Sequence, residues 1–211
     1  MDAIEILKKC DHTLLKQTAT WEDIRRILDE GIRNECASCC IPPYFVRQAK
    51  EYVGERIRIC TVIGFPNGYN ATSVKAYETE VAVADGADEI DMVINLGAVR
   101  ARDRESAVSD VAAVRAACRG KILKVIIETC LLEEDEKRWA CLAAVEGGAD
   151  YVKTSTGFST AGATIEDVRL MKETVGDAAL VKAAGGIRDM DFAAELIEAG
   201  ASRIGESKLK Q

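Results

Sequence analysis

Short apolar runs that alternate with helix-like segments most constrain how this chain of 211 residues can fold. Runs rich in Val and Ile predict eight strands, over 12–15, 36–41, 57–63, 89–94, 122–128, 151–154, 179–183 and 202–204. Apolar spacings of three or four predict helices over 21–30, 43–52, 73–84, 104–117, 134–146, 164–174 and 190–199. This alternation favours one α/β domain over residues 1–211, a (β/α)8 TIM barrel, with a doubly wound open sheet as the competing architecture.

Local signals agree with that alternation. The segments ADGADEID (84–91), EGGADYVK (146–153) and EAGASRIG (198–205) each read helix end, glycine turn, small residue, strand. Glycine is favoured after a helix because it enters the left-handed backbone region without a Cβ clash. Thr20 and Thr164 each precede an Asp by three residues and are predicted helix N-caps. No GxGxxG motif opens a helix, which weakens the dinucleotide-binding version of the open sheet.

Charge and composition exclude several classes of function. The net charge is −7 and no basic block occurs, so we expect no nucleic-acid partner. No apolar run is long enough to predict a membrane span. The N-terminal segment lacks a secretory pattern, which predicts a reducing, cytoplasmic location and free thiols for the eight cysteines. Cys36 and Cys39 have metal-like spacing, but they stand alone and His12 is the only histidine, which disfavours a structural zinc site.

Charged residues interrupt the predicted strands. Four consecutive predicted strands contain Asp91, Lys124, Lys153 and Lys182. Glu128 shares a strand face with Lys124, and Asp11 and Thr13 flank the first strand. Barrel active sites gather at the carboxyl ends of the strands. Burial and a nearby second cation both lower the pKa of a lysine, and a neutral amine can form a Schiff base with a carbonyl. The structural alternative is that Asp91 accepts a backbone or lysine hydrogen bond, and that Lys124 pairs with Glu128 or Asp91.

Glycines follow the last three predicted strands. They are Gly157, Gly185, Gly186 and Gly205. Barrel enzymes often bind phosphate at these loops, because glycine lets backbone N–H groups approach an anion closely. Ordinary strand-to-helix turns are the alternative interpretation. Three such loops together point the same way as the lysine pair, toward a catalytic site at the carboxyl ends of the strands.

At these residues the sequence resembles the deoxyribose-phosphate aldolase family of class I, Schiff-base aldolases. The resemblance covers nearly the whole chain, through DHTLLK (11–16), GFP (64–66), VADGADEIDMVIN (83–95), KVIIETCLL (124–132), YVKTSTGF (151–158), KAAGGIR (182–188) and GASRIG (200–205). It implies a (β/α)8 barrel that needs no metal or organic cofactor. It also implies reversible cleavage of 2-deoxy-D-ribose 5-phosphate to D-glyceraldehyde 3-phosphate and acetaldehyde.

The same resemblance implies roles for individual residues. Lys153 matches the Schiff-base lysine, Lys182 the lysine that lowers its pKa, and Asp91 the aspartate that transfers protons. The supporting substrate network comprises Asp11, Thr13, Cys40 and Lys124. The phosphate-binding loops comprise Gly157, Gly185, Gly186, Gly205 and Ser207.

Two positions depart from the family pattern. Glu206 brings an anion to the turn where phosphate is expected, unless its side chain points outward or Lys208 or Lys210 offsets it. Pro42 stands where the family often has Asn, beside Cys40. These departures keep three alternatives open: another Schiff-base aldolase, a phosphosugar barrel enzyme with a different or unphosphorylated acceptor, and a non-catalytic sugar-phosphate or protein binder. The sequence leaves the oligomeric state open, and a homodimer is one of the alternatives.

Overall fold

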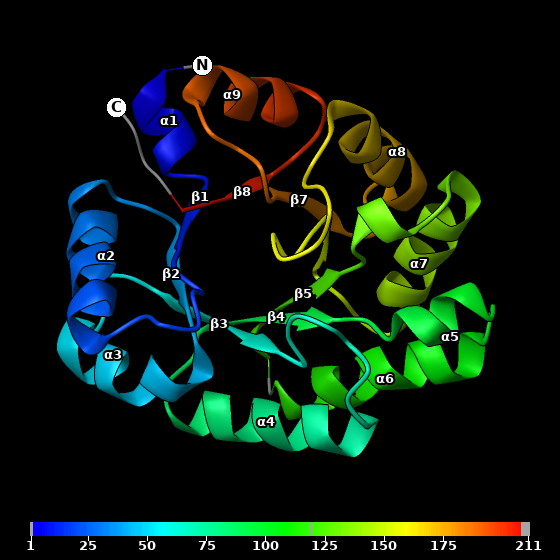
Figure 1. Cartoon of the computed structure of the whole chain (residues 1–211), viewed down its shortest axis with the longest axis horizontal. Helices are drawn as coiled ribbons and strands as arrows, with labels where there is room; N and C mark the ends of the chain where they lie inside the picture. The colour runs from blue at the N-terminus through cyan, green and yellow to red at the C-terminus, as the bar shows by residue number, and fades with distance from the viewer. Residues whose placement is uncertain (1, 119, 208–211) are drawn as a thin grey trace.

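The chain folds into a closed barrel of eight parallel strands in the order β1 to β8, as the sequence predicts (Figure 1). A computed structural model describes residues 2–118 and 120–207. The strands are β1 (Cys10–Thr13), β2 (Ser38–Ile41), β3 (Ile59–Ile63), β4 (Glu89–Val93), β5 (Ile122–Ile126), β6 (Tyr151–Lys153), β7 (Leu180–Ala184) and β8 (Arg203–Glu206). β8 pairs with β1, so no strand edge is left open. The competing open sheet is therefore wrong.

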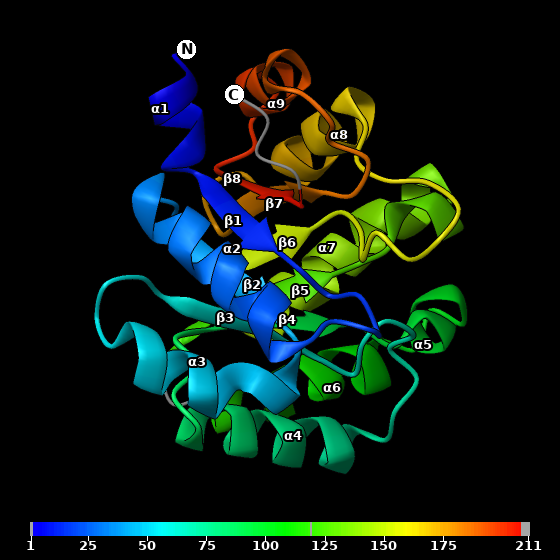
Figure 2. The ribbon, with the colours of Figure 1, turned by 60° about the vertical axis from the view of Figure 1, so that its left-hand side comes forward.

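Helices form the outer ring of the barrel. They are α1 (Ala3–Leu7), α2 (Trp21–Arg33), α3 (Val46–Val53), α4 (Thr72–Ala84), α5 (Leu96–Arg100), α6 (Arg104–Ala117), α7 (Glu134–Glu146), α8 (Ile165–Val175) and α9 (Met190–Glu198), with 3₁₀ turns η1 (Pro43–Phe45) and η2 (Thr129–Leu131). All seven predicted helices are present, whereas the short α1 and α5 were not predicted. Figures 1 and 2 both show α1 beside α9, so the N-terminal helix covers the junction of the first and last strands. Within the described ranges, none of these helices combines the length and apolarity that a membrane crossing requires.

The local signals hold in the structure. Thr20 forms a capping box with Asp23, and the Thr164 side chain accepts from the Asp167 amide. The glycines of the three related segments have left-handed φ angles of 105°, 94° and 119° at Gly86, Gly148 and Gly200. Each glycine therefore turns the chain from a helix into the strand that follows, where an L side chain would be strained.

The apolar core lies between the barrel and the helices. Side chains of a strand alternate between this shell and the barrel interior. In β4, for example, Ile90 and Met92 belong to the main apolar cluster, whereas Glu89 and Asp91 take part in buried ion pairs. The alternation places apolar residues outside the barrel wall and charged residues inside it, so the interior can hold a polar site.

Helix α4 packs with a face different from the one its apolar spacing suggests. Val74, Tyr77 and Val81 are exposed by 50%, 69% and 42%, while Lys75 and Thr79 are buried against the barrel. The Lys75 ammonium is held by the Val93 carbonyl and the Asp110 carboxylate of α6, 2.9 and 2.6 Å away. A buried charge is tolerated when it is paired in this way. The helix assignment is right, but its apolar stripe faces outward.

Candidate active site

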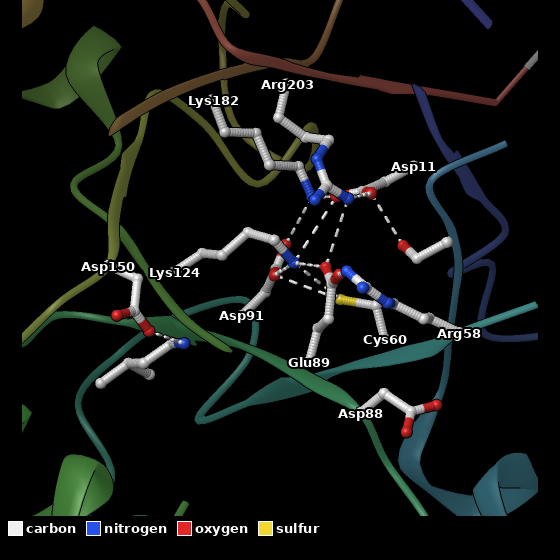
Figure 3. A network of polar contacts seen from close by, with 12 residues as sticks. Asp11, Arg58, Cys60, Asp88, Glu89, Asp91, Lys124, Asp150, Lys182 and Arg203 are labelled. Carbon is white, nitrogen blue, oxygen red and sulfur yellow. Dashed lines mark hydrogen bonds and ion pairs between the residues drawn. The ribbon is translucent and has the colours of Figure 1, made fainter. Parts of the chain in front are cut away.

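A network of buried charges fills the interior of the barrel (Figure 3). Its members are Asp11 of β1, Glu89 and Asp91 of β4, Lys124 of β5, Lys153 of β6, Lys182 of β7 and Arg203 of β8. In Figure 3 Lys182 and Arg203 extend from one side of the barrel and Lys124 from another, and all three reach toward the same carboxylates. The closed sheet thus brings together side chains that are up to 192 positions apart in the sequence.

Asp91 is the centre of this network. Its Oδ2 accepts from Lys153 Nζ at 2.7 Å and from Lys182 Nζ at 2.8 Å. Its Oδ1 accepts from Lys124 Nζ at 2.8 Å. Lys153 and Lys182 are direct register partners on β6 and β7, and both bind the same oxygen. The two amines of the lysine pair are therefore close neighbours, and both are buried.

Two further carboxylates, those of Asp11 and Glu89, pair with the cations around Asp91. Asp11 accepts from Lys182 Nζ at 2.5 Å and from Arg203 at 2.6 Å, and the Ser38 hydroxyl donates to it at 2.7 Å. Glu89 lies 2.6 Å from Lys124 Nζ. Each buried ion thus has partners of opposite charge, which offsets part of the large cost of removing it from water.

The network keeps Asp91 and Lys182 charged. Burial alone would raise the pKa of Asp91, but the ammonium groups of Lys124, Lys153 and Lys182 outweigh it and hold that pKa well below its usual value. Burial likewise lowers the pKa of Lys182, yet the carboxylates of Asp11 and Asp91 reverse this and raise it. Lys182 is therefore a permanent cation next to Lys153 at neutral pH.

The buried charges do not cancel when every group is ionised. Four cations, Lys124, Lys153, Lys182 and Arg203, face three anions, Asp11, Glu89 and Asp91. Removing one proton from the cations gives three charges of each sign. Of the three lysines only Lys153 lines a cleft that opens at the barrel mouth. Lys153 is accordingly the lysine of the network that borders the cleft.

Two thiols lie beside Asp91. Cys40 and Cys60 are register partners on β2 and β3, and Cys60 Sγ donates to Asp91 Oδ1 at 3.2 Å. The two sulfurs and the carboxylate lie within 4.8 Å of one another, a spacing that metal sites also show. Lys124 Nζ is 3.4 Å from Cys60 Sγ and 2.8 Å from Asp91, so an ammonium already fills the position of a cation. All eight cysteines are free thiols.

The remaining predicted network residues occupy less central positions. Thr13 is half-buried, and its hydroxyl donates to the Asp11 carbonyl at 2.8 Å. Glu128 does not pair with Lys124, because β5 ends at Ile126 and the backbone then turns to a φ of 51°. Instead Glu128 accepts from the Thr156 amide at 3.1 Å, which ties it to the loop after β6.

Sequence reasoning missed two members of the network, Glu89 and Arg203, and the neighbouring thiol of Cys60. Glu89 lies two residues before Asp91 and shares its strand face, a signal that the period of two could have supplied. Arg203 is a charged residue within the predicted strand 202–204, the same signal that marked the other strands, whereas Cys60 carries no such marker. Only the barrel register places them beside Asp11 and Asp91.

The glycine loops line the same cleft as Lys153. This cleft, of about 330 Å³, includes Gly157, Gly185, Gly186, Gly205 and the exposed Ser207 among its lining residues. The first three have left-handed φ angles of 82°, 84° and 74°, so glycine is required there. Gly205 does not follow the last strand as expected but lies within β8, where a Cβ would approach Ala184 Cβ to 2.9 Å.

Glu206 lies at the end of β8 and is one of the residues that line the cleft. Side chains alternate between the two faces of β8, so Arg203 and Glu206, three positions apart, lie on opposite faces. Since Arg203 faces the interior, the Glu206 side chain faces the helix layer. Its Oε1 is buried without a hydrogen-bond partner among the described residues. Burial, with a smaller contribution from Asp189, raises the pKa of Glu206 to about 7. The anion expected in the phosphate turn is thus turned away from it, and Lys208 and Lys210 lie outside the described residues.

A buried lysine cluster at the mouth of a (β/α)8 barrel is typical of enzymes that form a Schiff base with a carbonyl substrate. Comparison with known proteins agrees. The DeoC/LacD family aldolase pattern matches residues 6–207. A deoxyribose-phosphate aldolase from Streptococcus pyogenes serotype M4 (strain MGAS10750) is 51% identical over 209 residues, which cover 99% of this chain and 94% of that protein. One from Clostridioides difficile (strain 630) is 48% identical over 204 residues, or 97% and 93% of the two chains.

Solved structures show the same fold. The aldolase QR15 superimposes with a TM-score of 0.93 and 39% identity, over 97% of this chain and 92% of that one. The deoxyribose phosphate aldolase from Aeropyrum pernix, described as having a unique tetrameric structure, gives a TM-score of 0.91 at 29% identity, over 98% and 88%. The chain belongs to the DeoC/LacD family of aldolases.

The raised pKa of Glu206 makes stability depend on pH. A carboxyl whose pKa rises from 4.5 to about 7 on folding stabilises the protein fully below pH 4.5, and this contribution is lost as the pH rises through 7. We expect Glu206→Gln to remove this loss. Between pH 5.5 and pH 8 the variant should gain about 2 kcal/mol in unfolding free energy relative to the parent chain. Urea unfolding at both pH values measures the difference. The exposed Glu166→Gln is the control, and parallel pH curves for Glu206→Gln and the parent chain would contradict the assignment.

Proposed function

We propose that this chain is a class I aldolase that reversibly cleaves 2-deoxy-D-ribose 5-phosphate to D-glyceraldehyde 3-phosphate and acetaldehyde through a Schiff base on Lys153. The observation that carries the proposal is the pairing of Lys153 and Lys182 on one oxygen of Asp91. The names of the relatives and the family motifs support the same substrate. The continuous barrel from residue 10 to residue 206 supports a single domain, and no step below uses a cofactor.

The first step requires Lys153 as a free amine. In the proposed reaction this amine borders the cleft, where a substrate carbonyl can reach it, while Lys182 stays charged beside it. The amine then attacks the carbonyl carbon of the substrate, and the resulting carbinolamine loses water to give an iminium ion. The iminium restores a positive charge at the position that Lys153 occupied, so the pairing with Asp91 is kept.

Asp91 is placed to move protons during these steps. Its Oδ2 lies 2.7 Å from Lys153 Nζ, within reach of both the amine and the hydroxyl of a carbinolamine on that nitrogen. Because its pKa is low, Asp91 holds a proton only transiently and returns it to the substrate. Lys124 fixes the other carboxylate oxygen at 2.8 Å and thereby sets the orientation of the carboxylate.

The carbon–carbon step uses the iminium as an electron sink. In cleavage, the C3 hydroxyl loses its proton, the C2–C3 bond breaks and its electrons form an enamine, which releases D-glyceraldehyde 3-phosphate. Protonation of the enamine and addition of water then release acetaldehyde and free Lys153. The glycine loops and Ser207 would hold the phosphate group, because they line the same cleft as Lys153.

A trapping experiment tests this proposal. The chain should release D-glyceraldehyde 3-phosphate from 2-deoxy-D-ribose 5-phosphate. Borohydride added with acetaldehyde should inactivate it and leave an ethyl group on Lys153, which peptide mass mapping detects. Borohydride without aldehyde is the control. An unmodified Lys153 peptide in an inactivated sample, or no cleavage of the phosphosugar, would refute the assignment.

Lys182 gives a second test. Lys182→Met removes the permanent cation beside Lys153, so the remaining carboxylates stabilise the protonated, unreactive amine. We expect kcat/KM to fall by about 100-fold, equivalent to about 3 kcal/mol, and the acidic limb of the pH–rate profile to move to higher pH. Lys172→Met, at a partly exposed lysine of α8, is the matched control. A lower rate with an unchanged pH profile would argue for a structural role of Lys182 instead.

We further propose that two copies of the chain associate through α4. Its stripe of Val74, Tyr77 and Val81 is exposed, and burial of such a stripe supplies the driving force for association. The tetrameric description of the Aeropyrum pernix relative is compatible with self-association in this family. Tyr77→Glu should shift the mass measured by sedimentation equilibrium to that of the monomer, whereas Leu142→Glu, at an exposed leucine of α7, should not. Equal masses for the two variants would disprove this interface.

A further inference from the structure

Glu128 is a buried carboxyl that the reaction described above does not use. Its side chain is 3% exposed and lines a hollow of about 440 Å³ that shares Thr156 and Phe158 with the Lys153 cleft. Glu128 itself lines the hollow and not the cleft. Within the described residues, all hydrogen bonds of its side chain go to Thr156. Any effect of Glu128 on the reaction must therefore pass through the loop after β6.

The backbone at Glu128 is held in an uncommon conformation. Its φ and ψ angles are 51° and 66°, in the left-handed region that residues other than glycine seldom occupy unless surrounding contacts hold them there. The Ile127 amide donates to the Lys153 carbonyl at 3.0 Å. The Thr129 amide donates to the Thr154 carbonyl at 2.9 Å. The turn at Glu128 is therefore bound on both sides to the backbone that carries the reactive lysine.

The carboxylate of Glu128 binds two donors of a single residue in the loop after β6. Its Oε1 accepts from the Thr156 amide at 3.1 Å, and its Oε2 accepts from the Thr156 hydroxyl. The same hydroxyl oxygen accepts from the Phe158 amide at 3.0 Å. One carboxylate therefore fixes the amides on both sides of Gly157, the first directly and the second through a hydroxyl.

Gly157, between these two amides, differs from its neighbours. It lines the Lys153 cleft with a left-handed φ of 82°, and its own amide donates to no partner among residues 2–118 and 120–207. Backbone N–H groups that are free in this way can bind an anion such as phosphate. The direction of the Gly157 amide depends on the peptide groups beside it, and Glu128 holds those groups.

We propose that Glu128 is a positioning residue for the substrate phosphate: it holds the Thr156 and Phe158 amides and so keeps the Gly157 amide available at the cleft. The inference rests on the proposed cleavage of a phosphosugar, in which the glycine loops hold the phosphate group. The hydrogen bonds of Glu128 and its negative charge act on that phosphate in opposite directions. The hydrogen bonds fix a donor that the phosphate needs, whereas the charge repels it. Substitutions that remove one property and keep the other therefore separate the two effects.

A comparison of phosphorylated and unphosphorylated substrates tests the proposal. The quantity measured is the ratio of kcat/KM for 2-deoxy-D-ribose 5-phosphate to kcat/KM for 2-deoxy-D-ribose. We expect Glu128→Ala to lower this ratio about tenfold or more and to raise the Kd for inorganic phosphate by a similar factor, because the Gly157 amide is no longer held. Glu128→Gln keeps hydrogen bonds to the Thr156 amide and hydroxyl but loses the charge. Both quantities should then stay within about twofold of the parent chain or shift in favour of phosphate.

Two further variants control for folding. Glu128→Gly suits the left-handed backbone and removes the same carboxylate, so it should reproduce the result of Glu128→Ala in a folded chain. Asp110→Asn weakens another buried carboxylate, which pairs with Lys75 in the helix layer. This variant should lower the free energy of unfolding and leave the ratio of the two substrates unchanged.

The outcomes distinguish the positioning role from the aldolase chemistry. If Glu128→Ala and Glu128→Gly keep the parent ratio and phosphate affinity, or lose activity toward both sugars equally, Glu128 does not position the phosphate. The same conclusion follows if Glu128→Gln is as impaired as Glu128→Ala, because its hydrogen bonds are kept. If the parent chain cleaves neither sugar and Lys153 is not trapped, the aldolase proposal fails, whereas the Kd for inorganic phosphate still decides the role of Glu128.

Discussion

The carboxylate of Asp91, buried inside the barrel among three ammonium groups, is the constraint on which the rest of the site depends. Buried ions are tolerated only when opposite charges and hydrogen bonds replace the lost water. Asp91 satisfies this for Lys124, Lys153 and Lys182 at once, and they satisfy it for Asp91. Removing Asp91 would leave Lys153 without a carboxylate partner and would take one partner from both Lys124 and Lys182.

The reactivity that we propose for Lys153 depends on the same network. Lys182 is doubly anchored by Asp11 and Asp91 and stays charged, while Lys153 has one carboxylate partner and borders the cleft. Two lysines of the same type therefore take different roles because their partners differ. The proposed aldolase chemistry depends on where this one amine lies: Lys153 lines the same cleft as the glycine loops and Phe158.

Predictions that depend on interactions between residues close together in the sequence were correct. The cap at Thr20 and the turn at Gly86 depend on neighbours within a few residues, and both are present as expected. The adjacency of Lys153 and Lys182 was also predictable, because consecutive strands of a parallel barrel are neighbours. The spacing of Val74, Tyr77 and Val81 correctly indicated a helix but not the side on which it packs. That side is set by the ion pair between Lys75 and Asp110 of another helix.

The sequence by itself determined the strand–helix alternation, the barrel class and the lysines and aspartate of the centre, because periodicity, caps and family motifs are written in contiguous residues. Only the tertiary structure decided that Arg203 and Glu89 join the buried charges of the centre and that Glu206 is a buried carboxyl with a raised pKa. The physical reason is barrel closure. It fixes which strand faces which, and so decides which distant charges share one buried volume.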